Sequence, residues 1–297
     1  MGLQKFSRKR CSRGKLLVRR GTEFISVDGV ELADFGGEGP IVLFSHANGY
    51  PPQVYTELLS ALSKSFRVLG IEHRPLRGGN PNDFLSWDVM SEDIVKVIDF
   101  FNEPIFGFGH SMGGSALMMA TKHRPDCFRA LALVEPVLLP KVAQFALNIV
   151  AKRFPSRVPP IRRALNRTDN WDNRDLAFDH FRPKRVFKHF SDAALWDYVE
   201  NGTYIRDGRA YLRFSKEWEA RCYALVQNVW PLLGELRMPV VGFKGANSNT
   251  LPASAWQKWK LKAPAHQFVE IEESGHLLPL EYPNLLASHV ATFFTSI

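Results

Sequence analysis

Residues 104–114 of this chain contain a Gly-x-Ser-x-Gly pattern centred on Ser111, within the run Pro-Ile-Phe-Gly-Phe-Gly-His-Ser-Met-Gly-Gly. An apolar run precedes the pattern, and a helix-like run from Ser115 to Lys122 follows it. A strand that turns sharply into a helix strains the residue at the bend, and flanking glycines leave room for such a bend. The serine hydroxyl then stands at the carboxyl end of a strand, beside the positive end of a helix. We therefore predict that Ser111 is a nucleophile, the alternative being a glycine-rich turn that merely contains a serine.

His276 is the strongest candidate for the base that such a nucleophile needs. A serine hydroxyl requires a base to take its proton, and the base requires a partner that orients it. His276 follows Glu272-Glu273-Ser274-Gly275, between the last expected strand and the last expected helix. That position puts it at the same edge of the sheet as Ser111. The alternative is an ordinary surface histidine.

Several motifs occur in a fixed order along the chain, and together they resemble the α/β-hydrolase superfamily of serine esterase and lipase type. The resemblance covers about residues 22–297 and rests on Phe44-Ser45-His46-Ala47-Asn48-Gly49, Gly109–Gly113, Ser274-Gly275-His276 and Glu281-Tyr282-Pro283. It implies an α/β fold with a mostly parallel central sheet flanked by helices. It also implies a helical cap inserted after the strand that follows the helix of the nucleophile elbow.

The acid of the triad is not where most members of that superfamily carry it. They place it after the strand that follows the cap, but residues 239–269 contain no Asp or Glu. Glu135 ends the strand after the elbow and follows Ser111 by 24 residues, which resembles the haloalkane-dehalogenase-like branch. We therefore predict Glu135 as the acid, with Glu272 and Glu273 as rivals. The alternative role for Glu135 is a carboxylate that caps the first helix of the cap.

Acyl transfer also needs two backbone N–H donors for the oxyanion. The first donor is expected to be Met112, directly after the nucleophile. By resemblance to the His-Gly-x turn of the family, the second is the N–H of Asn48. His46 is expected to be a structural histidine of that turn. The loop at residues 74–79 resembles a structural Arg-Gly loop of the family, so Arg77 is assigned no chemistry.

Charge and composition indicate how the chain is divided. The net charge is +8, and residues 1–20 carry eight basic residues and no acid, so the remainder is neutral. We expect residues 1–20 to be a solvated basic tail, with an organelle-targeting segment as the alternative. The α/β-hydrolase core is predicted at 21–136 and 232–297, and the helical cap at 137–231.

Short apolar runs alternate with helical patterns in the predicted core, which is typical of a parallel sheet covered on both faces. An opening hairpin is expected around Asp28-Gly29. The other expected strands and helices are 41–45, 67–72, 105–109, 130–134, 239–243 and 267–271 for strands, and 54–62, 87–102, the run after Ser111 and 283–295 for helices.

The predicted cap is mostly helical and holds 15 of the 36 aromatic residues. A helix over residues 139–154 places Val142, Phe145, Ala146, Ile149 and Val150 on one face. We expect that face to be buried over the substrate pocket. Residues 136–168 carry seven basic residues and no acid, so contact of this segment with an anionic membrane is an alternative that we do not favour here.

The sequence therefore predicts a serine hydrolase that cleaves carboxylic esters with small to medium acyl chains. Alternatives on the same triad are an interfacial lipase, a cofactor-free perhydrolase, a lactonase, a C–C bond hydrolase or a receptor that kept the triad. The expected partner is a small-molecule ester. The sequence makes no prediction of oligomeric state.

No cofactor or metal is expected, because the three cysteines, Cys11, Cys127 and Cys222, are scattered and lack metal-ligand spacing. Their odd number favours a reduced, cytoplasmic protein. No apolar run approaches the length of a membrane helix. Nucleic-acid binding is not expected, because the chain beyond its first 20 residues is neutral.

Overall fold

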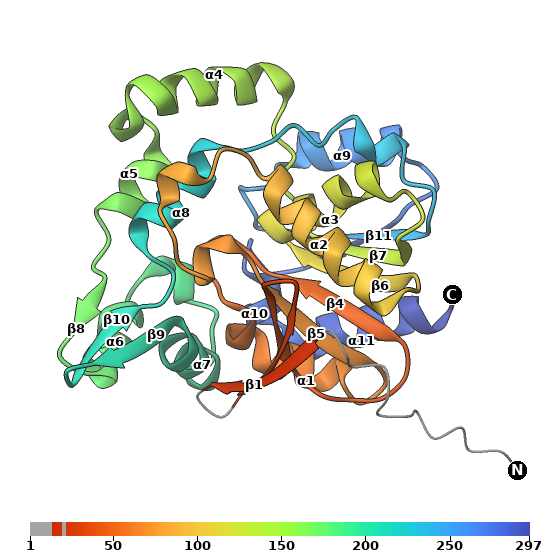
Figure 1. Ribbon diagram of the computed structural model, residues 1–297. Helices are drawn as coiled ribbons and strands as arrows, with labels where there is room; N and C mark the ends of the chain where they lie inside the picture. The colour runs from red at the N-terminus through yellow and green to blue at the C-terminus, as the bar shows by residue number, and fades with distance from the viewer. Residues whose placement is uncertain (1–13, 20–21) are drawn as a thin grey trace, which may run out of the picture.

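The central feature of the computed structural model, which describes residues 14–19 and 22–297, is a nine-stranded sheet with helices on both faces (Figure 1). In spatial order the strands are β1 (Gly14–Arg19), β2 (Thr22–Val27), β3 (Val30–Asp34), β5 (Arg67–Glu72), β4 (Ile41–Ser45), β6 (Ile105–His110), β7 (Phe128–Val134), β11 (Val240–Gly245) and β12 (Gln267–Ile271). In this order, neighbouring strands from β5 onwards pair in parallel. The pairs β1 with β2, β2 with β3 and β3 with β5 are antiparallel.

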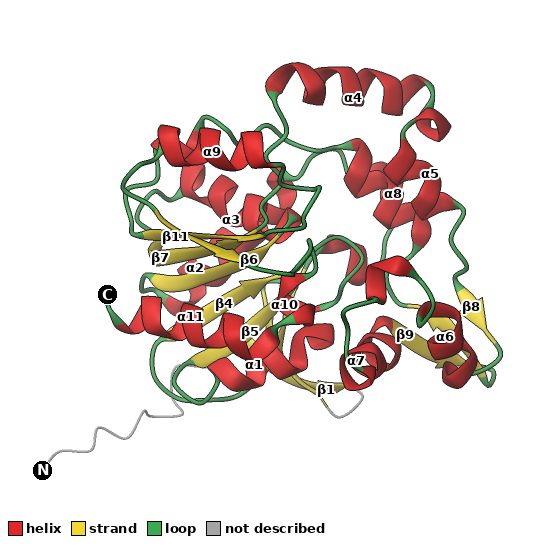
Figure 2. Cartoon of the chain, turned by 180° about the vertical axis from the view of Figure 1, so that it is seen from behind, coloured by secondary structure: helices red, strands yellow, loops and turns green. Residues whose placement is uncertain are grey.

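Helices cover both faces of this sheet because its central strands are apolar on both sides, as expected of a parallel sheet. Every residue of β6 and of β11 is buried. One face packs against α2 (Asp88–Phe101), α3 (Met112–His123) and α9 (Ala253–Lys262), and the other against α1 (Thr56–Leu62), α10 (Leu278–Glu281) and α11 (Pro283–Thr295) (Figure 2). The predicted α/β class with a mostly parallel sheet is confirmed.

The amino-terminal hairpin and strand show one confirmed prediction and one correction. Asp28 and Gly29 have φ of 46° and 78°, so the turn between β2 and β3 uses the left-handed residues that such hairpins require. The prediction that residues 1–20 form a tail is wrong for residues 14–19, which form β1 and pair antiparallel with β2. Their Leu-Leu-Val sequence favours a strand in spite of the flanking charges. Residues 1–13 lie outside the described residues.

Residues 137–231 contain five helices. They also contain a small three-stranded sheet, which we did not predict. The order in that sheet is β8-β10-β9. Its strands are too short to leave a sequence pattern. The elements are α4 (Lys141–Arg153), α5 (Pro159–Leu165), β8 (Asn170–Trp171), α6 (Arg174–Phe181), α7 (Asp192–Gly202), β9 (Thr203–Arg206), β10 (Arg209–Leu212) and α8 (Lys216–Ala224). Within the described ranges, no helix is both long and apolar enough to cross a membrane.

Helix α4 differs from expectation in the face that it buries. Four of the five residues of the predicted face, Val142, Phe145, Ala146 and Ile149, are exposed, so the prediction that this face is buried is wrong for all of it except Val150. The helix packs instead through Leu147, Val150 and Ala151, which join a small cluster with residues of α5 and α8. Amphipathic spacing tells which residues share a face, but it does not tell which face the neighbouring helices cover.

A buried carboxylate fixes the loop after β5, the Arg-Gly loop of the sequence analysis. Asp93 on α2 is 1% exposed. It accepts hydrogen bonds from Arg74 Nε at 2.8 Å, from Lys96 Nζ at 3.3 Å and from Arg77 Nη2. Burial of Asp93 opposes its ionisation, but the hydrogen bonds and charges of Arg74 and Arg77 hold its pKa below the ordinary value. Arg77 also donates to Gly29 O, so its role is structural.

Replacing Asp93 tests how much its ion pairs with Arg74 and Arg77 contribute to stability. We expect Asp93→Asn to lower the free energy of unfolding by about 3 kcal/mol near neutral pH, because it leaves the charge of the mostly buried Arg77 without its carboxylate partner. Because the pKa of Asp93 is lower in the folded than in the unfolded protein, its ionisation stabilises the folded protein at pH values above the unfolded pKa of about 3.9. That stabilisation is lost as the pH falls through the folded-state pKa. Urea unfolding of both proteins should therefore show a difference that shrinks below about pH 4. A difference that stays constant with pH would contradict the ion-pair account.

Candidate active site

Ser111 lies at the bend between β6 and α3. Its φ and ψ are 54° and −118°, a strained conformation for a residue with a side chain. The bend needs its glycines: a Cβ on Gly113 would lie 2.0 Å from Ser45 O, and one on Gly109 would lie 2.6 Å from Gly114 Cα. The Ser111 N–H is held by Val134 O at 2.9 Å. The elbow is therefore fixed from both neighbouring strands, with the Ser111 side chain at the carboxyl edge of the sheet.

The structure brings His276 between Ser111 and Glu135. Its Nε2 lies 3.0 Å from Ser111 Oγ, and its Nδ1 lies 3.2 Å from Glu135 Oε2. A carboxylate only accepts hydrogen bonds, so Nδ1 carries the proton and donates to Glu135. In the neutral ring Nε2 is then the acceptor, and Ser111 Oγ–H donates to it. This is the arrangement that a base requires in order to take the proton of a serine.

Glu135 is fully buried, and the loop after β11 holds its carboxylate. Its φ is 47°, and its N–H donates to Phe243 O at 2.9 Å. The carboxylate accepts from Gly245 N–H at 2.9 Å and from the Ser248 hydroxyl at 2.6 Å. Residues 245–248 therefore supply hydrogen-bond donors in the loop that sequence analysis found to lack an acid. Sequence reasoning missed Ser248, because a hydroxyl in a loop without a motif carries no signal of its own.

The two rival carboxylates, Glu272 and Glu273, are exposed, and His276 Nδ1 faces Glu135 instead. A different acid supports the loop that carries His276. Glu281 Oε2 accepts from Gly275 N–H at 2.6 Å, and burial raises the pKa of the Glu281 carboxyl. The Glu-Tyr-Pro motif at 281–283 thus has a physical role, which is to hold the backbone directly before His276.

The two expected oxyanion donors lie on neighbouring segments. Met112 is the first residue of α3. Asn48 follows β4, whose last residue, Ser45, packs against α3. Across the described part of the chain neither the Met112 N–H nor the Asn48 N–H has a hydrogen-bond acceptor. The Asn48 side chain donates from Nδ2 to Glu219 O of α8 at 3.1 Å, so residues 137–231 contact this loop directly.

His46, next to these donors, has a structural role. Its Nδ1 donates to Ala47 O at 2.8 Å, and its Nε2 accepts from His73 N–H at 3.3 Å. Burial lowers the pKa of His46 to about 4, so the ring is neutral near neutral pH. Both ring nitrogens are occupied within the fold, which leaves His46 unsuited to act as a base.

A second histidine, His110, ties the elbow to the loop of His276. Its Nε2 donates to His276 O at 2.8 Å, and its Nδ1 accepts from the Tyr55 hydroxyl at 2.9 Å. Tyr55 Oη accepts in turn from Ala47 N–H at 3.4 Å. Burial lowers the pKa of His110 well below the ordinary value, which keeps the ring neutral. The His276 carbonyl, which only accepts, places the ring proton on Nε2. The loop that carries Ala47 and Asn48, the elbow and the loop of His276 therefore share one chain of hydrogen bonds.

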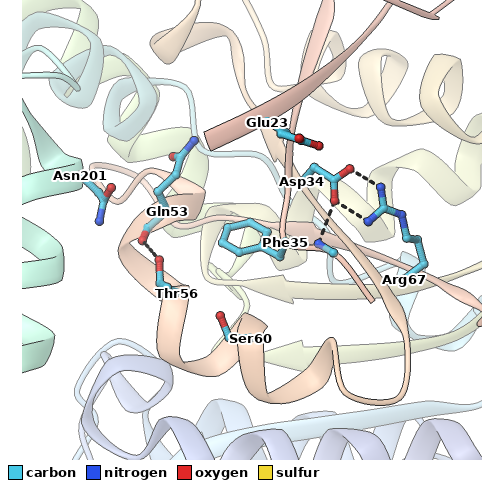
Figure 3. Close-up of a pocket in the computed structure, with 9 residues that line it drawn as sticks. Glu23, Asp34, Phe35, Gln53, Thr56, Ser60, Arg67 and Asn201 are labelled. Carbon is cyan, nitrogen blue, oxygen red and sulfur yellow. Dashed lines mark hydrogen bonds and ion pairs between the residues drawn. The ribbon is translucent and has the colours of Figure 1, made fainter. Parts of the chain in front are cut away.

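A polar cavity of about 480 Å³ lies elsewhere, beside β2, β3 and α1 (Figure 3). Its lining includes Glu23, Gln53 and the ion pair of Asp34 with Arg67. None of the residues around Ser111 lines it, so we assign it no part in the chemistry. Among the described residues there is also no group of three or more His, Cys, Asp or Glu side chains that could hold a metal ion.

Comparison with protein families places this geometry in context. Residues 42–289 match the model of the alpha/beta hydrolase family. The match runs from β4 into α11 and so includes the elbow, the loop of His276, and β7 with Glu135 directly after it. It covers most of the chain.

The chain is also similar to individual proteins, to one in sequence and to others in fold. A Type I acyl-CoA thioesterase of Penicillium roqueforti, mpaH, is 26% identical over 163 residues, which span 47% of this chain and only 36% of that protein. The solved thioesterase domain from the curacin biosynthetic pathway has a TM-score of 0.72 at 19% identity, over 93% of this chain and 98% of that one. An M. tuberculosis esterase has a TM-score of 0.72 at 17% identity, over 95% and 92% of the two chains.

The bonds of His110 make a prediction that is independent of any activity. We expect His110→Phe to lower the free energy of unfolding by about 2–4 kcal/mol, because it leaves the buried O–H donor of Tyr55 without an acceptor and the part-buried His276 carbonyl without its donor. Tyr55→Phe removes only the bonds of the hydroxyl and should cost less. Urea unfolding followed by tryptophan fluorescence measures both. Equal stability of His110→Phe and the wild type would contradict the role given to His110.

Proposed function

Since the chain belongs to the alpha/beta hydrolase family, we propose that it is a serine hydrolase that cleaves carboxylic esters through an acyl-enzyme. The observation that carries the proposal is the line of hydrogen bonds from Ser111 Oγ to His276 Nε2, at 3.0 Å, and from His276 Nδ1 to Glu135, at 3.2 Å. In this proposal Ser111 is the nucleophile, and His276 acts first as general base and then as general acid. The Glu135 carboxylate orients the His276 ring.

The first half of the reaction forms the acyl-enzyme. His276 Nε2 takes the proton of Ser111 as Oγ attacks the ester carbonyl carbon, and the carbonyl oxygen gains the negative charge. The N–H groups of Met112 and Asn48 are proposed to bind that oxygen, in keeping with their lack of an acceptor among the described residues. The protonated His276 then gives its proton to the leaving alkoxide, the carbonyl reforms, and the alcohol departs.

The second half returns the enzyme to its starting state. Water gives a proton to His276 Nε2 and attacks the acyl carbon, and His276 then returns that proton to Ser111 Oγ as the carboxylic acid leaves. The imidazolium forms twice in each cycle, and the Glu135 carboxylate stabilises it each time. Two neutral donors already bind that carboxylate, which supports its orienting role over a role as a base.

The substrate is proposed to be a small-molecule ester of small to medium acyl chain length. Residues 137–231 bring aromatic rings towards the loop after β4 that carries Asn48: the rings of Tyr198 on α7 and Tyr50 lie 5.4 Å apart, between centroids. Such rings favour an apolar acyl or alcohol group. Thioesters are a second candidate, because a sequence relative and a structural neighbour are thioesterases and the same acyl-enzyme serves both ester types.

The direct test of the proposed function measures hydrolysis of p-nitrophenyl acetate, butyrate and longer esters, beside acyl-CoA thioesters of matched chain length. We expect turnover by the wild type. For Ser111→Ala we expect a loss of at least about a thousandfold in kcat, because the substitution removes the nucleophile and leaves the other groups of the site in place. Equal low rates from the wild type and Ser111→Ala would reject the proposal. Turnover of the thioesters alone would reject the oxoester specificity and keep the mechanism.

The acid is tested by comparing three substitutions. We expect Glu135→Gln to lower kcat by roughly 10²–10⁴-fold, because the amide no longer stabilises the imidazolium and can favour the wrong tautomer of His276. Glu272→Gln and Glu273→Gln are matched controls and should leave kcat within about twofold of the wild type, as expected of exposed substitutions. A nearly unchanged kcat for Glu135→Gln, together with loss of activity in either control, would move the acid to that residue.

A further inference from the structure

The outer face of α4 is an exposed apolar stripe on a helix that is otherwise anchored. Val142, Phe145 and Ile149 are 81%, 67% and 53% exposed, and their spacing of three and four residues places them on one face. The opposite face is held by α5 and α8 through Leu147 and Ala151. In both views α4 lies along the outer edge of the molecule, with α5 and α8 beneath it (Figures 1 and 2).

Positive charges border this stripe. Lys141 lies four residues before Phe145, and Lys152 and Arg153 lie three and four residues after Ile149, so all three adjoin the stripe. All three are exposed. Across the described residues none of them forms an ion pair. An apolar stripe bordered by unpaired basic residues is complementary to a surface that is anionic outside and apolar beneath.

The turn after α4 extends the same surface. Phe154 is 46% exposed, and the Arg157 guanidinium lies 4.6 Å from the centroid of its ring. Arg162 and Arg163 on α5 are also exposed. Residues 136–168 contain no acidic residue, so nothing within this segment opposes an anionic partner.

We propose that α4 and the turn at residues 154–157 dock on anionic lipid surfaces. The helix would lie in the plane of the interface, with the side chains of Val142, Phe145 and Ile149 below the headgroups and the basic side chains among the lipid phosphates. This reverses the preference of the sequence analysis, which rested on burial of the apolar face. The proposal concerns binding, and it does not depend on the proposed ester hydrolysis.

A second copy of the chain fits this face less well. A twofold interface brings the same patch of both copies together. The basic residues Lys141, Lys152 and Arg153 of one copy would then lie near the same three residues of the other, and like charges across an interface are unfavourable. The charge pattern therefore favours lipid over self-association, and the experiment below separates the two.

Vesicle flotation with the full chain tests the docking. The probes are vesicles of phosphatidylcholine alone and vesicles of three parts phosphatidylcholine to one part phosphatidylserine. We expect the wild type to bind the phosphatidylserine vesicles in low salt and to release them at about 0.5 M salt. The triple variant Val142→Ser, Phe145→Ser, Ile149→Ser should bind at least about tenfold more weakly. The variant Lys141→Gln, Lys152→Gln, Arg153→Gln should show a similar loss, confined to the phosphatidylserine vesicles.

Matched controls make the result specific to α4. Leu85 and Leu261 are 72% and 83% exposed elsewhere on the surface, and their joint change to Ser should leave vesicle binding unchanged. Ser111→Ala should also bind as the wild type does, so a failure of ester hydrolysis is distinguishable from a failure of docking. Every variant keeps residues 1–20, so differences between variants report α4 and not the basic amino terminus.

Three results would overturn the proposal. One is a wild-type chain that binds neither kind of vesicle, and another is a serine triple variant that binds as tightly as the wild type. The third is a wild-type chain that does not bind vesicles but forms a concentration-dependent dimer, measured by sedimentation velocity, which the serine triple variant abolishes. A Phe145→Trp variant whose fluorescence is quenched by brominated lipid would directly place α4 below the headgroups and support the proposal.

Discussion

The buried carboxylate of Glu135 joins three segments at one edge of the sheet. It accepts hydrogen bonds from Gly245 N–H, from the Ser248 hydroxyl and from His276 Nδ1. Hydrogen bonds to a charged group contribute about 1.5–3 kcal/mol each, and a buried carboxylate without them would be strongly destabilising. The position of His276 relative to Ser111 therefore depends on the left-handed turn that aims Glu135 at this point, directly after β7.

Two further hydrogen bonds hold the backbone around His276. His110 holds the carbonyl of His276, and Glu281 holds the N–H of Gly275. The imidazole is thus restrained through its own ring and through the backbone on both sides of its Cα. Because His110 stays neutral, its hydrogen-bond directions do not change over the ordinary pH range. A histidine fixed in this way loses little conformational entropy when it transfers a proton, which is the condition for a preorganised base.

The sequence predicted the α/β fold, the hairpin, the elbow and the family, because turn chemistry and apolar runs are local signals. It also brought Glu135 to the edge occupied by His276, since parallel strands end together. Residues whose roles come from tertiary contacts left no such signal: Ser248 is one hydroxyl in a loop, and the strands β8 to β10 pair over only a few residues. The exposed face of α4 was missed for the same reason. The catalytic roles of Ser111, His276 and Glu135 stay predictions.

The position of Glu135 before residues 137–231 has a consequence for how this protein can diversify. An acid that followed residues 137–231 would depend on how that segment returns the chain to the sheet. Here Ser111 and Glu135 are already in place when the segment begins at residue 137, and only His276 follows it. Insertions, deletions and exchanges within that one stretch can therefore alter which molecules are admitted, without a compensating change among the residues that would carry out the reaction.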